Sequence, residues 1–272
     1  MTVNELSAQG YSFLQTYIHR ESGIVLDEDK RYLIESRLLP IVRKENLASL
    51  DELCGHLAAG RRPTLATQVI DAMTTNETLF FRDSGIFDAL RTSVLPGLLA
   101  NLAGKRKLRI WSAASSTGQE AYSIAITLLE AGFGPGQVEI TGTDLSEQVL
   151  DRARAGRYVQ FEVNRGLPPT LLARYFSKSG MDWQISEQVR SMVSFQKMDL
   201  RGSLAAVGSC DLVLCRNVLI YFNAATKNQI LASIAQTLTP EGILVLGCAE
   251  TLIGIDHGFQ RKIIGQSTFY TL

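Results

Sequence analysis

From Leu108 onward, short apolar stretches alternate with helical patterns, and this alternation constrains the fold more than any other feature of the sequence. Helices are expected at 118–131, 146–155 and 224–238, and the predicted strands are LRIWSA, QVEITGTD, MVSFQKMD, CDLVLCRN and GILVLGCAE. Strands and helices that alternate in this way form a parallel sheet with helices on both faces. The final stretch, FQRKIIGQSTFYTL, holds two short strands without a helix between them, which predicts an antiparallel hairpin at the sheet edge.

The chain before this region predicts helices only. Residues 1–75 carry apolar residues at steps of three and four, so we expect a small all-helical N-terminal domain. A linker over 76–90 and an α/β domain over 91–272 follow. Within the α/β domain, residues 157–191 are too many for an ordinary connection. A hairpin turning at Ser179-Gly180 favours an inserted antiparallel β-subdomain there, and a long surface loop is the alternative.

Charge and composition argue against several classes of function. The chain has 27 Lys plus Arg and 27 Asp plus Glu, and a balanced charge disfavours a nucleic-acid partner. The four cysteines lack C-x-x-C spacing and the three histidines are far apart, so we expect no metal site. We recognise neither an export signal nor an apolar run long enough to span a bilayer, so we expect a cytoplasmic protein without direct membrane insertion.

The turn after the first predicted strand narrows the class of ligand. It reads SAASSTG, and only Gly118 stands where a dinucleotide-binding turn has three glycines. Small side chains still let backbone amides approach a ligand, and the start of the following helix offers unpaired N–H groups. A nucleoside without phosphates therefore suits this turn better than NAD, which argues against a dehydrogenase.

Polar residues come directly after successive predicted strands, where ligands bind in a doubly wound sheet. These residues are Glu120, Asp144, Asp199 and the pair Arg216-Asn217. Asp144 suits two ribose hydroxyls, and Asp199 suits an adenine amino group. Glu120 suits an ammonium group, while the backbone of Asn217-Val218 would wall the ligand. The alternative is that each acid merely caps the next helix, but their repetition at four strand ends favours a site.

A further polar group precedes the sheet, in TTNETLFFRD at residues 74–83. Asn76, Thr78 and Arg82 flank an apolar pair at the junction between the two predicted domains, and such junctions favour ligand sites. For Arg82 the alternative is an ordinary solvated charge.

Five motifs in this order resemble the CheR family of chemoreceptor glutamate methyltransferases: TTNETLFFRD, WSAASSTGQEAYSIAI, GTDLSEQVLDRARAGRY, CRNVLIYF and GILVLGCAETL. The resemblance covers nearly the whole chain. It implies a Rossmann-like class I methyltransferase sheet with a helical N-terminal domain and an inserted β-subdomain. It also implies methyl transfer from S-adenosylmethionine, a nucleoside without phosphates, to glutamate side chains of chemotaxis receptors. The products would be S-adenosylhomocysteine and glutamyl methyl esters, formed without a metal.

The resemblance also assigns roles to residues. Arg82 and Tyr221 would be the catalytic pair that orients the substrate, with the cofactor carboxylate as the alternative partner of Arg82. Family members often carry two acids in the turn motif, and Gln119 here leaves Glu120 alone for the cofactor ammonium. The residues implied to line the cofactor are Asn76, Thr78, Arg82, Ala113, Glu120, Asp144, Asp199, Leu200, Asn217 and Val218.

A candidate partner surface lies in the N-terminal domain. Lys30, Arg37 and Lys44 recur every seven residues and Arg43 adjoins the last, which predicts a basic stripe on one helix. A solvated face is the alternative, whereas the resemblance favours docking of the cytoplasmic helices of receptors in membrane arrays. In some relatives the β-insertion also docks a receptor C-terminal peptide by strand addition. The alternative function is a non-catalytic module that binds S-adenosylmethionine or its product.

Overall fold

The computed structural model describes residues 6–102, 106–255 and 257–272, which divide into two compact units. The first contains the described residues up to Thr75 together with Tyr221–Asn223, and the second contains the remainder. Each unit has a hydrophobic core cluster of its own. The predicted fold class is confirmed, because a helical unit precedes an α/β unit that carries a small inserted sheet.

The first unit is helical throughout its described part, and its helices begin and end at local signals. Ser7 Oγ accepts a hydrogen bond from Gly10 N at 2.9 Å where the first helix starts, and Gly23 ends that helix at a φ of 76°. Leu14, Ile34 and Leu38 are fully buried between the helices. The helices are α1 (Ala8–Ser22), α2 (Arg31–Lys44), α3 (Leu50–Ala59) and α4 (Pro63–Met73), with a 3₁₀ turn at Glu28–Lys30.

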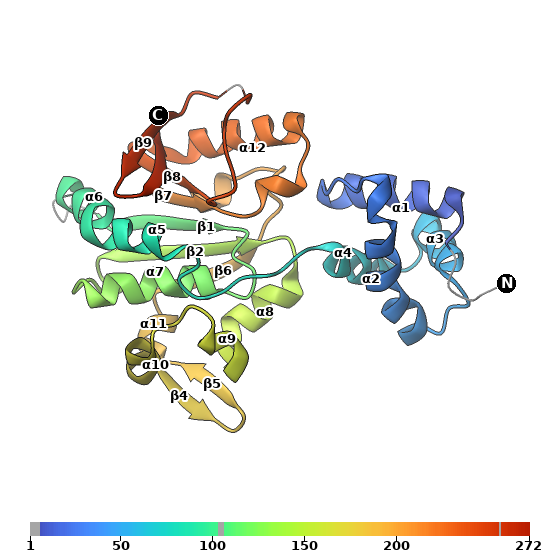
Figure 1. Cartoon of the computed structure of the whole chain (residues 1–272), viewed down its shortest axis with the longest axis horizontal. Helices are drawn as coiled ribbons and strands as arrows, with labels where there is room; N and C mark the ends of the chain where they lie inside the picture. The colour runs from blue at the N-terminus through green and yellow to red at the C-terminus, as the bar shows by residue number, and fades with distance from the viewer. Residues whose placement is uncertain (1–5, 103–105, 256) are drawn as a thin grey trace. The chain divides into compact units, whose positions relative to one another are not determined.

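The second unit is built on a sheet whose described strands have the order β6-β2-β1-β7-β8-β10-β9 (Figure 1). The first five are parallel, and β10 pairs antiparallel with both β8 and β9, which confirms the predicted C-terminal hairpin. Their bounds are β1 (Leu108–Ala113), β2 (Val138–Asp144), β6 (Val193–Lys197), β7 (Cys210–Cys215), β8 (Leu238–Leu246), β9 (Gln260–Ile264) and β10 (Ser267–Thr271).

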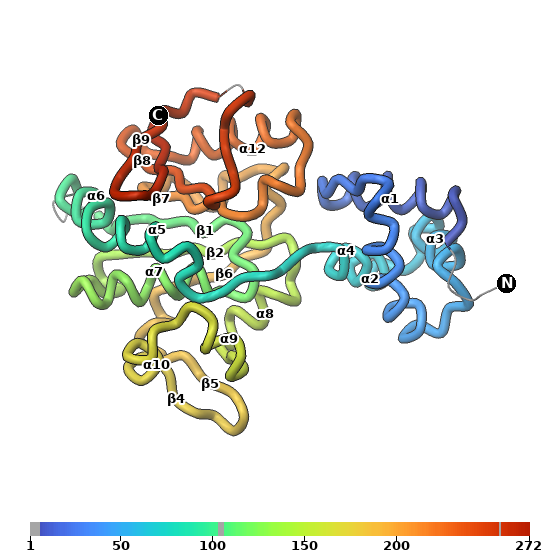
Figure 2. The backbone as a smooth tube through the Cα atoms, viewed as in Figure 1, coloured from blue at the N-terminus to red at the C-terminus, as the bar shows by residue number. Residues whose placement is uncertain are grey.

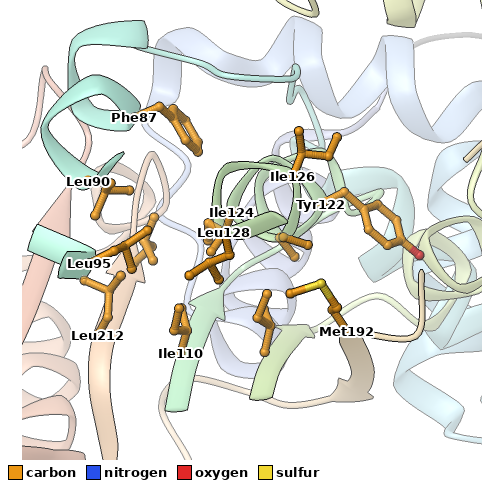
Figure 3. Close-up of a cluster of buried hydrophobic side chains, with 14 of the residues drawn as sticks. Phe87, Leu90, Leu95, Ile110, Tyr122, Ile124, Ile126, Leu128, Met192 and Leu212 are labelled. Atoms are coloured by element: carbon orange, nitrogen blue, oxygen red, sulfur yellow. The ribbon is translucent and has the colours of Figure 1, made fainter. Parts of the chain in front are cut away.

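Both faces of this sheet are covered. Ile110, Leu212 and Val245 belong to a core cluster with Phe87 and the apolar residues of α7, as Figure 3 shows for several of its members. Trp111, Val213 and Leu244 alternate with them along the strands, so they point to the opposite face, and they are fully buried as well. The helices are α5 (Ser84–Ala89), α6 (Leu95–Leu102) after a π-helical turn at Leu90–Val94, α7 (Gln119–Glu130), α8 (Glu147–Ala155), α11 (Glu187–Arg190) and α12 (Ala224–Thr237).

The expected insertion forms a three-stranded antiparallel sheet of order β3-β5-β4 on one side of the α/β unit (Figure 2). Tyr158 anchors it: its hydroxyl donates to the Thr117 carbonyl at 2.8 Å, and its ring packs edge-on against Phe80 with centroids 5.0 Å apart. The insertion is therefore fixed to the turn after β1. Its elements are β3 (Arg157–Val159), α9 (Gln160–Asn164), α10 (Pro169–Tyr175), β4 (Phe176–Ser179) and β5 (Asp182–Ile185).

An ion pair between a half-exposed arginine and a buried carboxylate holds the amino-terminal ends of β1 and β7 together. The Asp211 carboxylate accepts from the Arg106 guanidinium at 2.6 and 2.8 Å and from Arg109 N at 3.0 Å, and its side chain is 5% exposed. Burial acts to raise the pKa of Asp211, but the hydrogen bonds from Arg106 and Arg109 outweigh it and hold that pKa below its ordinary value.

We expect Asp211→Asn to lower the free energy of unfolding by about 1–3 kcal/mol at pH 7, because charge-assisted hydrogen bonds are lost. A carboxyl with a depressed folded-state pKa contributes stability above its unfolded pKa of about 3.9, and that contribution disappears as the pH falls through the folded value. In urea denaturation, the free energy of unfolding should therefore be higher for the wild type than for Asp211→Asn at pH 7, and this difference should shrink below about pH 4. A difference that does not depend on pH would contradict this assignment.

Candidate active site

The turn after β1 forms the centre of the candidate site. Ala114 and Ser116 adopt left-handed backbone conformations, with φ of 59° and 50°, and Ser115 N donates to the Thr143 carbonyl at 2.8 Å. Gly118 has a φ of 91°, and a Cβ there would stand 3.0 Å from the Cβ of Ala153. Local packing and backbone conformation thus both require a glycine at position 118.

Asp144 stands at the end of β2 beside this turn. Its carboxylate accepts from Ser116 N at 2.9 Å and from Ser146 N at 3.1 Å, and the residue is 8% exposed. The hydroxyl groups of Ser115 and Ser146 are buried and have no hydrogen-bond partner within the described chain. Buried polar groups are normally paired, so these hydroxyls fit a ligand that carries hydroxyl groups of its own.

Glu120, at the start of α7, is paired within the protein. Its carboxylate accepts from Ser112 Oγ at 2.7 Å and from Arg216 Nη1 at 2.8 Å. Arg216 also donates to the Asp83 carboxylate and to the Arg82 carbonyl, each at 2.7 Å. Burial raises the pKa of Glu120 despite the opposing charge of Arg216. Burial also acts to raise the pKa of Asp83, but Arg216 and Cys248 hold that pKa below its ordinary value.

Arg216 is the main site residue to which the sequence analysis gave no role. Its side chain is only 1% exposed, and its Nε has no hydrogen-bond partner in the described part of the chain. The sequence pointed to Arg216 only through its position directly after β7. The spacing of residues along the chain could not show that Arg216 bonds to Glu120, Asp83 and the Arg82 carbonyl. Glu250, just after the end of β8, was missed as well.

The polar segment before α5 reaches the same turn. The Asn76 carbonyl accepts from Ser116 Oγ at 2.8 Å, and Phe81 N donates to Ser123 Oγ at 3.0 Å. The Arg82 guanidinium donates to the Glu77 carbonyl at 3.2 Å. Asn76 and Thr78 also line a cavity of about 540 Å³, together with Thr117, Gln119 and residues of α8 and α9. The structure therefore brings Asn76 and Thr78 to the turn, whereas the Arg82 guanidinium bonds within its own segment.

The predicted residues after β6 and β7 lie at the carboxyl edge of the sheet, where β6 borders β2 and β7 borders β1. Met198 N donates to the Asp144 carbonyl at 2.9 Å, which joins the end of β6 to that of β2. Asp199 is paired with the Arg201 guanidinium at 2.6 Å, and Leu200 and Ala113 are buried. Asn217 follows β7 with a left-handed φ of 58°.

Tyr221 falls outside the unit that contains these residues. Tyr221–Asn223 pack with the helical unit, where the Tyr221 carbonyl accepts a hydrogen bond from Val25 N at 3.0 Å. The pairing of Tyr221 with Arg82 stays a prediction.

The predicted basic stripe is only partly available to a partner. Lys30 donates to Asp27 at 2.9 Å. Arg37 donates to the carbonyls of Met73 and Thr74 at 2.8 and 3.2 Å and to Thr75 Oγ1 at 3.0 Å, so it caps the end of α4. Arg43 and Lys44 are exposed at the end of α2. Part of the stripe thus stabilises the unit itself.

The described residues contain no group of three or more His, Cys, Asp or Glu side chains placed to hold a metal ion. None of their helices is both long and apolar enough to cross a membrane.

Comparison with known proteins identifies the family. Residues 9–74 match the model of the CheR methyltransferase all-alpha domain, and residues 76–267 match that of the CheR methyltransferase SAM binding domain. The chain belongs to the CheR methyltransferase family. This CheR protein is an enzyme of the methyltransferase class that uses S-adenosylmethionine in chemotaxis, so the predicted family, enzyme class and cofactor are confirmed.

Relatives of this CheR protein match it over nearly their whole length. The chemotaxis protein methyltransferase of Vibrio parahaemolyticus is 41% identical over 100% of both chains. Chemotaxis protein methyltransferase 1 of Pseudomonas aeruginosa is 41% identical over 92% of this chain and 93% of its own. The chemotaxis protein methyltransferase of Escherichia coli K12 is 31% identical over 97% and 91% of the two chains.

We expect Arg216→Ala to destabilise the protein by about 3–5 kcal/mol, because it leaves two carboxylates, one of them deeply buried, without their cation. Urea denaturation measures this change. Arg91→Ala is the matched control, since Arg91 and Asp88 form a pair with side chains 55% and 71% exposed, and its loss should cost less than about 1 kcal/mol. Equal and small losses for the two variants would show that the Arg216 pairs contribute nothing net.

Proposed function

We propose that this enzyme methylates glutamate side chains in the cytoplasmic domain of chemotaxis receptors and forms glutamyl methyl esters. The observation that carries the proposal is the polar cluster at the carboxyl ends of β2 and β1, where Asp144 lies beside the turn with the hydroxyls of Ser115 and Ser146, which have no partner among the described residues. This cluster suits the ribose of S-adenosylmethionine in a chain that matches the SAM binding domain of CheR enzymes.

The chemistry needs little from the protein beyond alignment. A glutamate carboxylate, with a pKa of about 4.3, is already ionised at neutral pH and needs no general base. The bound cofactor supplies a methyl group on a positively charged sulfur. Holding nucleophile, carbon and sulfur in line can contribute roughly 7–11 kcal/mol. Arg82 and Tyr221 orient the carboxylate, and Arg82 must bind it loosely because its charge is neutralised in the transition state.

The remaining roles follow the positions of the residues. Asp144 accepts from the ribose hydroxyls, Asp199 and Leu200 frame the adenine, and Asn217 with Val218 forms the wall at the methionyl end. Glu120 receives the cofactor ammonium with acceptor positions that Ser112 and Arg216 leave open, since a carboxylate has about four of them. Residues 76–90 act as a linker between a helical domain over 1–75 and a methyltransferase domain over 91–272. In this linker, Asn76 and Thr78 line the cofactor. Ala113 lies beneath the turn after β1.

Two surfaces serve the receptor. The basic end of α2, with Arg43 and Lys44 exposed, attracts acidic receptor helices. In the insertion, β3 and β4 are the outer strands of the sheet, and the nearby side chains of Phe161 and Met181 are 66% and 89% exposed. A receptor C-terminal peptide adds there as a further strand. These contacts recruit the enzyme to receptor arrays in the cytoplasm.

Methyl-labelled S-adenosylmethionine, incubated with the enzyme and receptor-containing membranes, tests the chemistry. We expect label on the receptor that mild alkali releases as volatile methanol, because esters hydrolyse under conditions that leave N-methyl groups in place. Asp144→Ala should give no label and no calorimetric binding of S-adenosylhomocysteine, while its thermal unfolding shows whether it is folded. Alkali-resistant label or an unlabelled receptor would reject the proposal.

We expect the double reversal Arg43→Glu/Lys44→Glu to raise the KM for receptor by about fivefold, equivalent to about 1 kcal/mol, because two exposed attractive charges become repulsive. The affinity for S-adenosylhomocysteine should stay unchanged, and the effect should weaken with added salt. Arg61→Glu is the control, since Arg61 is exposed between α3 and α4. An unchanged KM would remove the end of α2 from receptor recognition.

A further inference from the structure

Glu250 lies in the segment after β8 and ties two strand-end loops together. Its carboxylate accepts hydrogen bonds from four backbone amides: Asn217 N at 2.7 Å, Val218 N at 3.0 Å, Leu219 N at 2.8 Å and Gly247 N at 2.8 Å. Three of these amides are consecutive in the loop after β7. One side chain therefore satisfies the backbone donors of that loop and closes the loop after β8.

The geometry of the loop explains why an anion is held there. Asn217 has a left-handed φ of 58° and is followed by the 3₁₀ turn Leu219–Tyr221, so successive N–H groups turn toward one point. Such a concave run of amides binds anions, and hydrogen bonds to a charged acceptor are stronger than those between neutral groups. In this chain the anion is the Glu250 side chain itself.

A close approach at Gly247 supports the same arrangement. A Cβ at this position would stand 2.7 Å from Nδ2 of Asn217 and 2.9 Å from Oε2 of Glu250. The loop after β8 therefore passes against the Asn217 side chain with no room for a larger residue.

We propose that Glu250 is a positioning residue for the cofactor: its carboxylate holds the backbone of Asn217–Leu219 in the conformation that walls the methionyl end. This inference rests on the proposed role of Asn217 and Val218 at the cofactor. The bonds lie at the tip of the sheet and outside the main core cluster of this unit, so their loss loosens the loop while the fold persists.

Glu250→Gln tests the inference in the full chain. Glutamine keeps the shape, but its NH2 group faces amide donors, so at least part of the four-amide arrangement is lost. We expect the Kd for S-adenosylhomocysteine, measured by calorimetry, to rise about 10- to 100-fold. In the ligand-free protein the amides of 217–219 should exchange hydrogen faster, while those of 144–146 keep their rate. Glu250→Asp, which keeps the charge on a shorter side chain, should show a smaller rise in Kd.

Matched controls separate positioning from general damage. Glu241→Gln alters a carboxylate near the start of β8, at the opposite end of that strand from Glu250, which accepts from Asn101 Nδ2 at 2.6 Å, and it should leave Kd unchanged. Gly247→Ala should raise Kd as Glu250→Gln does, whereas Gly258→Ala should not, because a Cβ there has no heavy atom within 4 Å. If Glu250→Gln does not fold, the comparison of Kd between Gly247→Ala and Gly258→Ala tests the inference instead.

Wild-type affinity in both Glu250→Gln and Gly247→Ala, with unchanged exchange at 217–219, would overturn the inference. A wild-type protein that fails to bind S-adenosylhomocysteine would reject the proposed function. In that case the exchange rates still decide whether Glu250 fixes the loop.

Discussion

The candidate site depends on one buried cation. Arg216 joins the end of β7 to the start of α7 through Glu120 and to the segment before α5 through Asp83 and the Arg82 carbonyl. Parallel strands end with backbone and side-chain groups that have no partner within the sheet, and a ligand site requires those ends to be held apart and rigid. A guanidinium can do this because its donors point in several fixed directions. Glu250 holds strand ends as well, because its carboxylate accepts hydrogen bonds from the backbone amides that follow Arg216 and from Gly247 N after β8.

Much of the fold could be predicted from the sequence because its periodicities are local. The strand LRIWSA matches β1 residue for residue, and the two predicted hairpins lie at β4–β5 and β9–β10. The last parallel strand was placed too late: β8 begins at Leu238, before Pro240, where the pairing with β7 is irregular. A proline followed two residues later by a glycine resembles a turn in sequence, and only the tertiary pairing shows that the strand passes through Pro240 and Gly242. No structure was predicted for 84–102, which form α5, the π-helical turn and α6.

The site was less predictable, because strand ends can be located from sequence but hydrogen-bond partners cannot. Position alone singled out Asp144 and Glu120, yet it could not show that Glu120 is paired with Arg216, 96 residues away. Arg37 illustrates the same limit. Its heptad spacing suggests an exposed stripe, whereas its guanidinium caps a helix whose last residue, Met73, lies 36 positions further along the chain. Charge periodicity cannot tell a docking face from a cap, since both place cations on one side of a helix.

The anchoring of the insertion limits how this subdomain could be removed or transferred. Tyr158 supplies the donor for the Thr117 carbonyl and a ring that covers Phe80, so the subdomain completes the turn it borders. Removing residues 157–191 would take away the Thr117 hydrogen bond and the aromatic ring that covers Phe80. Grafting the insertion onto another methyltransferase would therefore require transplanting the segment that carries Phe80 as well.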